Sequence, residues 1–209
     1  MKILLIGATG MIGSRILAEA TSRGHSVTAA SRNPDKVAAL EGVEAISLDV
    51  DDPDAVATAS AEVDVVISAV SPRNSGDGVA DATRFTQSLI AASEKTGTRL
   101  LMVGGGSSLN MPDGTNALDL TPDTILPEAT GMRKAYGMLV SADIDFAVLA
   151  PGGMIEPGDR TGSFRTGGRT MLTTPDGGKS RISAEDYAIA MLDEAEAPKH
   201  FRTIFNVAY

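Results

Sequence analysis

The stretch Lys2–Gly13, KILLIGATGMIG, carries the strongest fold signal in the sequence. The apolar run Lys2–Ile6 is too short for a helix and predicts a buried strand, and the helical spacing of Met11–Arg23 predicts a helix that Gly24 ends. A glycine-rich turn between a strand and a helix is typical of dinucleotide-binding sites. Glycines allow the tight turn and the close approach of a pyrophosphate, and free amides at the helix start face the anion. The alternative is a turn required only for packing. The residues predicted to bind the cofactor here are Gly7, Ala8, Thr9, Gly10, Met11, Ile12 and Gly13.

Apolar runs and helical patterns alternate along the rest of the chain. Further strands are predicted at His25–Ser31, Glu44–Leu48, Val63–Ala69, Arg99–Val103 and Asp145–Ala150, and helices at Pro34–Leu40, Asp52–Ala61, Asp77–Thr96 and Ala129–Ala142. Strands separated by helices pair in parallel through right-handed crossovers. The sequence therefore predicts an α/β fold, a doubly wound parallel sheet of the NAD(P)-binding Rossmann type, as a single domain over residues 1–209. Ligands of such sheets bind beyond the carboxyl ends of the strands.

Two segments break this regular alternation and are expected to form the acceptor site. Residues 104–128 are rich in Gly, Ser, Asn, Asp and Pro, which predicts a long loop over the sheet. Residues 151–180 contain many Gly and Arg residues and predict a flap or a small hairpin. After them, Ser183 and Asp186 predict a variant capping box at the start of the last helix. Ile204–Ala208 is expected to be a final edge strand.

The composition excludes several classes of function. The chain has 209 residues with 18 Lys and Arg against 27 Asp and Glu, and its formal net charge of -9 repels nucleic-acid phosphates. The absence of Cys removes disulfides, thiolate nucleophiles and cysteine metal sites. The sequence has neither a secretory signal nor an apolar run that approaches the length of a membrane-spanning helix. We therefore expect a cytoplasmic protein that binds neither nucleic acid nor a membrane; whether it forms a homo-oligomer does not follow from the sequence.

The loop after the second predicted strand bears on the choice of cofactor. NAD sites usually place an acid there to bind the ribose 2'-hydroxyl, but this strand ends in Ser31 and Arg32. Arginine offers donors to a 2'-phosphate, so NADP(H) is preferred, although Asp35 could still serve NAD(H), and Arg32 could instead be a solvated charge. Asp49 and Val50 are placed to hold the adenine, and Ala69 and Val70 to pack on the adenosine. Each of these two pairs could also be merely structural.

Several motifs resemble a known family. GATGMIG, with SRNPDKV, LDVDDPDAV and VDVVISAV, is similar to the atypical short-chain dehydrogenases/reductases. LLMVGGGSSL, DFAVLAPGGMIEPGDRTGSFRTGG and SRISAEDYAIAMLDE resemble the NADH-flavin-reductase-like NAD(P)-binding proteins, relatives of the NmrA-like and biliverdin reductase B groups. The resemblance spans the whole chain and implies one Rossmann domain that binds NAD(P)H. It also implies that the backbone of Pro151, Gly152 and Met154 flanks the nicotinamide amide.

The chain departs from the wider superfamily in its chemistry. Classical members use a Tyr-x-x-x-Lys pair to relay a proton to a carbonyl, but Tyr136 is followed four residues later by Val140, Tyr187 by Met191, and Tyr209 ends the chain. The two histidines are poorly placed for a Ser-His-Asp site, and a metal site is not expected. Hydride transfer to a flavin or quinone can take its proton from solvent. The hypothesis is therefore an NAD(P)H-dependent reductase of a planar conjugated acceptor, with FMN or FAD as candidate substrates.

The candidate residues for this chemistry lie around the two irregular segments. Gly104 and Gly105 follow the fifth strand, where nicotinamide and acceptor should meet, and a hydroxyl of Ser107 or Ser108 could donate to the acceptor. Both serines could equally serve only to shape a turn. An apolar acceptor wall is predicted from Met132, Tyr136, Met154 and Phe164, although such residues are more often ordinary core. Arg160 and Arg165 could hold an anionic group of the acceptor, or be solvated charges. Lys134 is a catalytic candidate because reductases among the NmrA-like relatives use a lysine on this helix, and Tyr136 on the same helix is a further catalytic candidate.

Two other functions fit parts of the sequence. A non-catalytic dinucleotide sensor of the NmrA-like kind would explain the missing catalytic pair, whereas residues 104–128 and 151–180 favour a pocket. A sugar-nucleotide epimerase or dehydratase is disfavoured, because Tyr-x-x-x-Lys is missing and few residues follow the sixth strand to build a substrate domain.

Overall fold

The computed structural model describes residues 1–73, 75–174 and 180–209. Its central element is an eight-stranded sheet in which β1 (Lys2–Ile6) lies between strands from both halves of the chain, in the order β3-β2-β1-β4-β5-β6-β10-β8. The neighbours of β1 are β2 (Ser26–Ser31) and β4 (Val65–Ser68). The other strands of the sheet are β3 (Val43–Ser47), β5 (Arg99–Val103), β6 (Phe146–Pro151), β10 (Thr203–Ala208) and β8 (Arg165–Gly167). All pair in parallel except β8, which runs antiparallel to β10. The predicted doubly wound sheet is confirmed.

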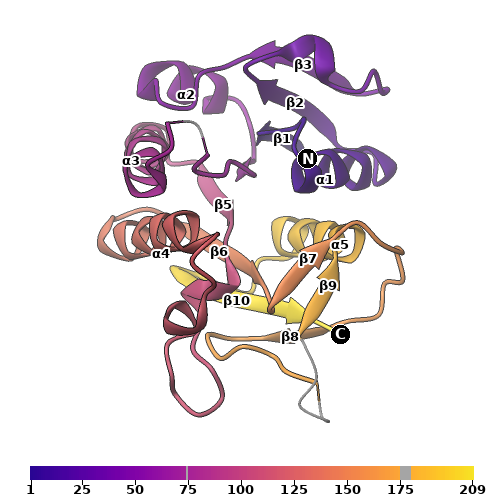
Figure 1. Ribbon diagram of the computed structural model, residues 1–209. Coiled ribbons are helices and arrows are strands. Elements are labelled where there is room, and N and C mark those ends of the chain that lie inside the picture. Colours follow the sequence, from indigo (N-terminus) through magenta and orange to yellow (C-terminus); the bar gives the residue numbers. More distant parts are fainter. Residues whose placement is uncertain (74, 175–179) are drawn as a thin grey trace.

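Helices cover both faces of the sheet. In Figure 1, α1 (Met11–Ser22) and α5 (Ala184–Glu196) lie on one side. The helices α2 (Pro53–Ser60), α3 (Gly78–Thr96) and α4 (Leu126–Ser141) lie on the other. The three-layer arrangement puts the starts of α1 and α4, and the loops that precede them, at the carboxyl edge of the sheet, where a ligand of this fold binds.

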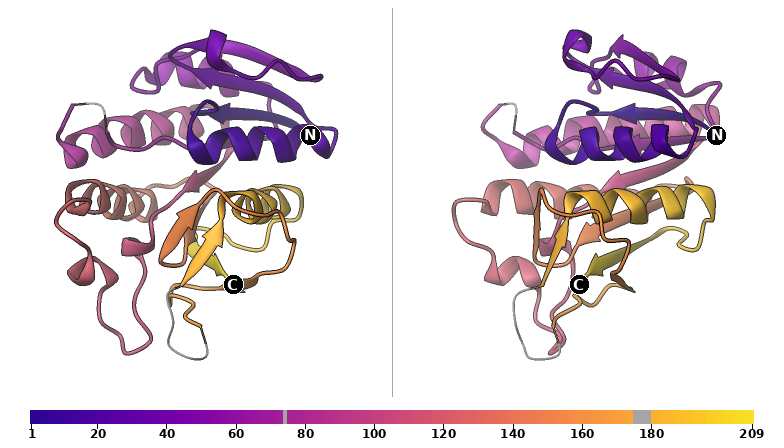
Figure 2. Two further views of the ribbon diagram at one scale, coloured as in Figure 1. Left: turned by 45° about the vertical axis from the view of Figure 1, so that its right-hand side comes forward. Right: turned by 90° about the vertical axis from the view of Figure 1, so that its right-hand side faces the viewer.

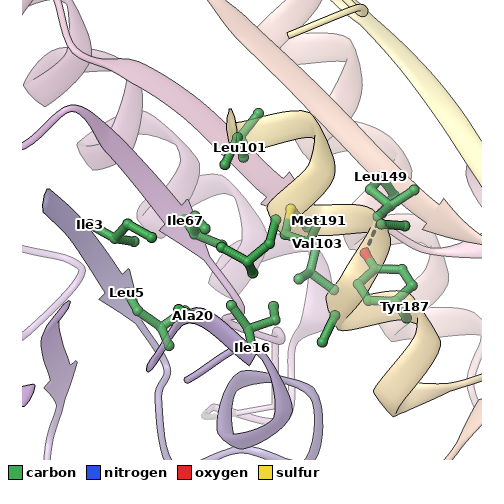
Figure 3. Close-up of a cluster of buried hydrophobic side chains, with 14 of the residues drawn as sticks. Ile3, Leu5, Ile16, Ala20, Ile67, Leu101, Val103, Leu149, Tyr187 and Met191 are labelled. Carbon is green, nitrogen blue, oxygen red and sulfur yellow. Dashed lines mark hydrogen bonds between the residues drawn. The ribbon is translucent and has the colours of Figure 1, made fainter. Parts of the chain in front are cut away.

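The alternation of side chains along β1 explains why the strand is apolar throughout. Ile3 and Leu5 belong to the buried cluster under α1 and α5, whereas Leu4 and Ile6 belong to the cluster under α2, α3 and α4. Burial of one such side chain is worth roughly 1.5–3 kcal/mol. Figure 3 shows the first cluster, in which the Tyr187 hydroxyl donates a hydrogen bond of 2.5 Å to the Leu149 carbonyl. Burial raises the pKa of Tyr187 well above its usual value, so this phenol is a neutral structural donor.

Three local predictions are wrong. Pro34–Leu40 forms only one 3-10 turn, η1 (Pro34–Lys36), because none of its residues is buried and a short helix needs a packed face. For the segment 151–180, predicted as a flap or a small hairpin, the hairpin alternative is wrong in the described part, because β7 (Met154–Glu156) pairs in parallel with β9 (Arg181–Ser183). Residues 175–179 lie outside the described residues. Because β8 pairs with β10, the last strand is not at the edge.

The segment 104–128 is more ordered than predicted. It contains the 3-10 turns η2 (Gly106–Ser108) and η3 (Ala117–Leu120), and α4 already begins at Leu126. The predicted cap of the last helix is confirmed, since the Ser183 hydroxyl accepts from the Asp186 amide at 3.0 Å. Within the part of the chain that the structure describes, none of the helices has both the length and the apolar character needed to cross a membrane.

Candidate functional site

The glycine loop between β1 and α1 is shaped by two close backbone approaches. Gly7 has φ of 87°, and a Cβ atom there would lie 2.8 Å from the Ala69 carbonyl oxygen. A Cβ atom on Gly13 would lie only 2.1 Å from the Gly7 carbonyl oxygen. Larger residues would therefore force the loop away from β4 and the helix away from the loop. The nearest atom to a Cβ atom on Gly10 would be 3.4 Å away, so the protein itself leaves room at Gly10 for a ligand.

The start of α1 is free to receive an anion. In α2, α3 and α5 the side chains of Asp52, Asp77 and Ser183 accept hydrogen bonds from the first amides. The first residue of α1 follows Gly10, which has no side chain to accept such bonds, and the first turn contains no acid. Amides left without an internal partner, together with the helix dipole, favour a phosphate at this position.

A cavity of about 310 Å³ opens beside this loop at the carboxyl ends of β1, β2 and β4. Its lining includes most of the predicted adenosine-binding residues from four separate loops. The lining residues are Ile6, Gly7, Thr9, Gly10, Ser31, Arg32, Leu48, Asp49, Val50, Ala69, Val70, Ser71 and Arg73. Of the other loop residues, Ala8 and Gly13 are buried, Ile12 packs against the core, and Met11 is exposed.

Polar groups in the cavity fit a phosphorylated adenosine. Ser31 is only 7% exposed, and its hydroxyl has no hydrogen-bond partner among the described residues. Arg32 is exposed and forms no ion pair with any residue in the ranges described. A buried hydroxyl without a partner is costly unless a ligand satisfies it. Asp35, the acid that could serve a 2'-hydroxyl, lies in η1, outside the residues that line this cavity.

Arg73 is a cavity residue that sequence reasoning missed. It lies five residues beyond the end of β4, and its Nε donates to Glu128 Oε2 at 2.8 Å. Glu128 belongs to the first turn of α4, so the ion pair joins the cofactor cavity to the helix that carries the predicted acceptor wall. The only sequence signal for it was an arginine in a loop at the carboxyl end of a strand.

The predicted nicotinamide region lies where the loops after β5 and β6 touch. A Cβ atom on Gly104 would lie 2.6 Å from Val148 Cγ1, and one on Gly106 would lie 2.2 Å from the Gly152 carbonyl oxygen. Pro151 ends β6, and Met154 begins β7 with its side chain 49% exposed. The two loops therefore approach each other closely, with glycines at the contact positions.

The predicted serines differ in their surroundings. The Ser107 hydroxyl lies 2.7 Å from Thr121 Oγ1, and the Ser107 carbonyl accepts a bond of 3.1 Å from Arg133 Nη1. The Thr121 hydroxyl also donates to the Ala117 carbonyl at 3.1 Å, which links η2 to η3. Ser108 is buried. Ser107 is thus held by other residues, and Arg133 is a second residue that the sequence reasoning missed.

Two residues of the predicted apolar wall lie on α4, in the core cluster under α2, α3 and α4. Met132 and Tyr136 are one helical turn apart and both are buried. A Cβ atom on Gly105 would lie 3.9 Å from Met132 Cβ, so the two predicted groups meet. The guanidinium of Arg169 lies 5.8 Å from the centre of the Tyr136 ring, an arrangement in which a cation faces an aromatic ring.

The two predicted acceptor loops are joined to each other and to the sheet. The Asn110 amide donates to the Arg169 carbonyl at 3.0 Å, and the Met171 amide donates to the Asn110 carbonyl at 2.8 Å. Buried Asn206 of β10 holds the second loop, since its Nδ2 donates to the Thr170 carbonyl at 2.9 Å and its Oδ1 accepts from the Leu172 amide at 3.0 Å. Both views in Figure 2 show the loops side by side below β10.

Other predicted residues are not brought to this place. Lys134 is exposed in a surface groove with Ile90 and Glu94 of α3, away from Ser107. Phe164 packs against the core cluster under α1 and α5. Arg165 donates to the carbonyls of Thr173 and Tyr209.

Arg160 is also engaged elsewhere. Its guanidinium makes two hydrogen bonds to Glu19 on α1, of 2.8 and 2.9 Å, and these bonds lower the pKa of Glu19. The surrounding segment is fixed by buried Asp186, which accepts from the Thr161 and Gly162 amides at 2.8 Å. This geometry explains Arg160 as an anchor of residues 157–163 on α1. In the described residues, His, Asp and Glu side chains form no group of three or more that could hold a metal ion.

Comparisons with known proteins agree with this geometry. A family model described as NAD(P)H-binding matches residues 7–198. The chain is 35% identical over 214 residues to the uncharacterized protein YwnB of Bacillus subtilis (strain 168), covering 99% of this chain and 98% of that protein. The amino-terminal and carboxyl-terminal halves are thus both matched.

Two solved structures extend the comparison. A candidate epimerase from Bacteroides thetaiotaomicron has a TM-score of 0.92 and 37% identity, with 100% of this chain and 96% of that chain covered. A candidate NADH-flavin reductase from Streptococcus pneumoniae TIGR4 has a TM-score of 0.87 and 29% identity, with 100% and 99% covered. The resemblance stated from the motifs is confirmed, while the two names describe different reactions.

Proposed function

Because the chain belongs to the NAD(P)H-binding family, we propose that it is an oxidoreductase that prefers NADPH and transfers hydride to a planar conjugated acceptor such as a flavin or a quinone. The observation that carries the proposal is the cavity between the glycine loop and Arg32, with the buried, unpartnered Ser31 hydroxyl in its wall. NAD(H) remains the alternative cofactor.

The residues of this chain divide the work of binding. Amides at the start of α1 donate to the diphosphate, and Arg32 and Ser31 take the phosphorylated ribose. Asp49 and Val50 lie on the adenine side of the cavity, with Ala69 and Val70 opposite. The backbones of Gly104, Gly105, Pro151 and Gly152 then bracket the nicotinamide, which supplies the hydride when bound.

On the acceptor side, the protein positions the acceptor and excludes water from it. Met132 and Tyr136 give a flat apolar wall beside Gly105. The chain has no Tyr-x-x-x-Lys pair, and the Ser107 hydroxyl is already within hydrogen-bond distance of Thr121. A flavin or quinone that gains a hydride can take its proton from solvent, whereas a simple ketone develops an alkoxide that needs a nearby donor. These surroundings therefore favour conjugated acceptors over ketones.

The direct test is a turnover assay with purified protein. We expect NADPH to be oxidised in the presence of FMN, FAD or a quinone, faster than NADH at equal concentration, and with one acceptor molecule reduced per NADPH consumed. Simple ketones and alcohols are the negative controls and should not be converted. Tight dinucleotide binding without turnover for any acceptor would contradict the reductase and favour the sensor.

The epimerase alternative gains weight only from the name of the Bacteroides relative. A sugar-nucleotide epimerase of this superfamily needs a proton relay, and this chain has no Tyr-x-x-x-Lys pair to provide it. Incubation with UDP-sugars, followed by chromatography, tests it. Conversion of a UDP-sugar without net consumption of dinucleotide would replace the reductase proposal.

A further inference from the structure

The arginines fall into two groups that occupy different parts of the molecule. The first group pairs with acids, mostly on the helix faces and at the amino edge, as in Arg23 with Glu19 at 2.9 Å and Arg99 with Glu194 at 2.7 Å, but it also includes Arg73 in the cofactor cavity. Among the described residues, the arginines without a carboxylate within 4.0 Å are Arg32, Arg133, Arg165, Arg169 and Arg181. All five lie in elements or loops at the carboxyl edge of the sheet.

This distribution is unexpected for a chain with a formal net charge of -9. Acids outnumber bases, so a surface arginine readily finds a carboxylate partner. Arg32 is accounted for by the cofactor, and Arg165 by two backbone carbonyls. Arg133 donates one hydrogen bond, to the Ser107 carbonyl, and the side chains of Arg169 and Arg181 have no hydrogen-bond partner among the described residues. Of these three, Arg133 and Arg169 lie beside the predicted acceptor wall.

The two guanidiniums come from different elements that both border Tyr136. Arg133 reaches the Ser107 carbonyl at 3.1 Å, and Arg169 lies 5.8 Å from the Tyr136 ring centre. Residues three apart on a helix are neighbours on its surface, so Arg133 and Tyr136 face the same region. The acids of the same loops, Asp113, Asp119, Asp123 and Glu156, form no ion pair with either arginine. The positive charge there is left for a ligand.

We propose that the acceptor is an anion, whose phosphate or carboxylate is held by Arg133 and Arg169 while its ring lies on the wall of Met132 and Tyr136. The proposal rests on the reductase function above and narrows its substrate class. A planar guanidinium fork matches the oxygens of either anion, and a cation stacked on an aromatic ring keeps its donors free at its edges. A neutral acceptor of the same ring system would lose these contacts.

The test compares acceptors that differ only by the anion. FMN and riboflavin share one ring and differ by a phosphate; a naphthoquinone with and without a carboxylate forms the second pair. With NADPH saturating, we expect the KM of the wild-type protein to be about tenfold lower for the anionic member of at least one pair. Arg133→Gln and Arg169→Gln should each raise the KM for that anion about tenfold and leave the neutral member unchanged. Arg169→Lys should retain part of the preference.

Controls separate this proposal from the function on which it rests. Lys95→Gln removes one exposed positive charge from the last turn of α3 and should leave every KM unchanged. Because Arg133→Gln also removes a bond to η2, Arg169→Gln, which breaks no hydrogen bond of the described residues, is the decisive variant. Equal KM values for anionic and neutral acceptors in the wild type would overturn the proposal while leaving the reductase intact. If no acceptor is reduced, quenching of flavin fluorescence still tests whether the site binds an anion. FMN should then bind more tightly than riboflavin to the wild-type protein, but not to the Arg133→Gln or Arg169→Gln variant.

Discussion

The two ends of the ligand-binding edge are built on different principles. The cofactor end is made of backbone: Gly7 and Gly13 allow approaches that a Cβ atom would block, and the start of α1 has no capping side chain. The proposed acceptor end is made of side chains from α4 and from two loops that hydrogen-bond to each other through Asn110. A backbone site recognises what all dinucleotides share, whereas a side-chain site can change its ligand by substitution. We therefore expect the acceptor end to tolerate substitutions better than the cofactor end.

The sharpest test of this contrast is a pair of glycine substitutions. Gly13→Ala places a methyl group 2.1 Å from the Gly7 carbonyl, so helix and loop must separate; we expect a loss of about 2–3 kcal/mol in unfolding free energy and at least a hundredfold loss of dinucleotide affinity. Gly137→Ala, in open space on α4, should stabilise the protein by up to about 1 kcal/mol and leave binding unchanged. Urea denaturation and calorimetric titration measure both. Tight NADPH binding by Gly13→Ala would break the contrast.

The next effect concerns Arg32, the cavity side chain proposed to select the 2'-phosphate. Arg32→Asp replaces donors by a repelling carboxylate and should raise the Kd for NADPH about a hundredfold, with little change for NADH. Fluorescence titration with both nucleotides gives the ratio directly. An equal loss for the two would show that Arg32 does not select the 2'-phosphate. Lys36→Gln, which removes a nearby exposed charge in η1, is the control and should leave the ratio intact.

The ion pair between the two ends predicts a smaller effect with an unusual sign. Glu128 holds Arg73, which lines the cofactor cavity, so Glu128→Gln should free this arginine and lower the Kd for NADPH about threefold. Arg73→Gln should raise the same Kd by a similar factor. If both substitutions weaken binding, the carboxylate holds Arg73 in its productive position instead of competing for it.

Acid stability tests the anchoring of the flap outside the cofactor end. Burial would raise the pKa of Asp186, but the donors from Thr161, Gly162 and Tyr209 outweigh it and hold the pKa below its usual value. As the pH falls, the Asp186 carboxylate therefore takes up a proton in the unfolded chain before it does so in the folded protein. The stabilisation by ionised Asp186 is complete above the unfolded pKa of about 3.9 and is lost as the pH falls through the lower pKa of the folded protein. Asp186→Asn should be less stable near neutrality and show a shallower loss below about pH 4. Parallel curves of unfolding free energy against pH would contradict this.

The smallest effect is expected at Arg160. Its donors are occupied by Glu19, so Arg160→Gln should leave the KM for every acceptor unchanged and lower the thermal midpoint slightly. A steady-state assay with FMN and a melting curve are sufficient. An increased KM would return Arg160 to the acceptor site, where the sequence alone had placed it as a candidate.

The cofactor end could be predicted from the sequence because its signals are local. The strand, turn and helix of residues 2–23 are contiguous, and Ser31, Asp49 and Val70 follow from the rule that loops at the carboxyl ends of parallel strands converge. The acceptor end could not be predicted to the same depth. Arg160 is paired with Glu19, a residue 141 positions earlier in the sequence. Arg133 and Lys134 are adjacent and both positively charged, but only Arg133 lies on the side of α4 that reaches Ser107.

Pairings distant in sequence also account for the errors in the fold. No periodicity distinguishes β7 and β9, of three residues each, from an ordinary loop, and their parallel pairing depends on the whole segment between them. The same holds for β8, whose three residues extend the sheet past β10. Short strands carry too few alternating positions to be recognised without their partners.

The bridge through Asn110 bears on how proteins of this shape diversify. Its two backbone hydrogen bonds tie residues 110 and 169–171 into one body, and Asn206 of β10 fastens that body to the sheet. A graft of one loop from a relative would leave its counterpart's amides unsatisfied, so a change of ligand range by recombination must exchange both segments together. Point substitutions at their tips carry no such constraint, which makes gradual drift the easier route to a new acceptor.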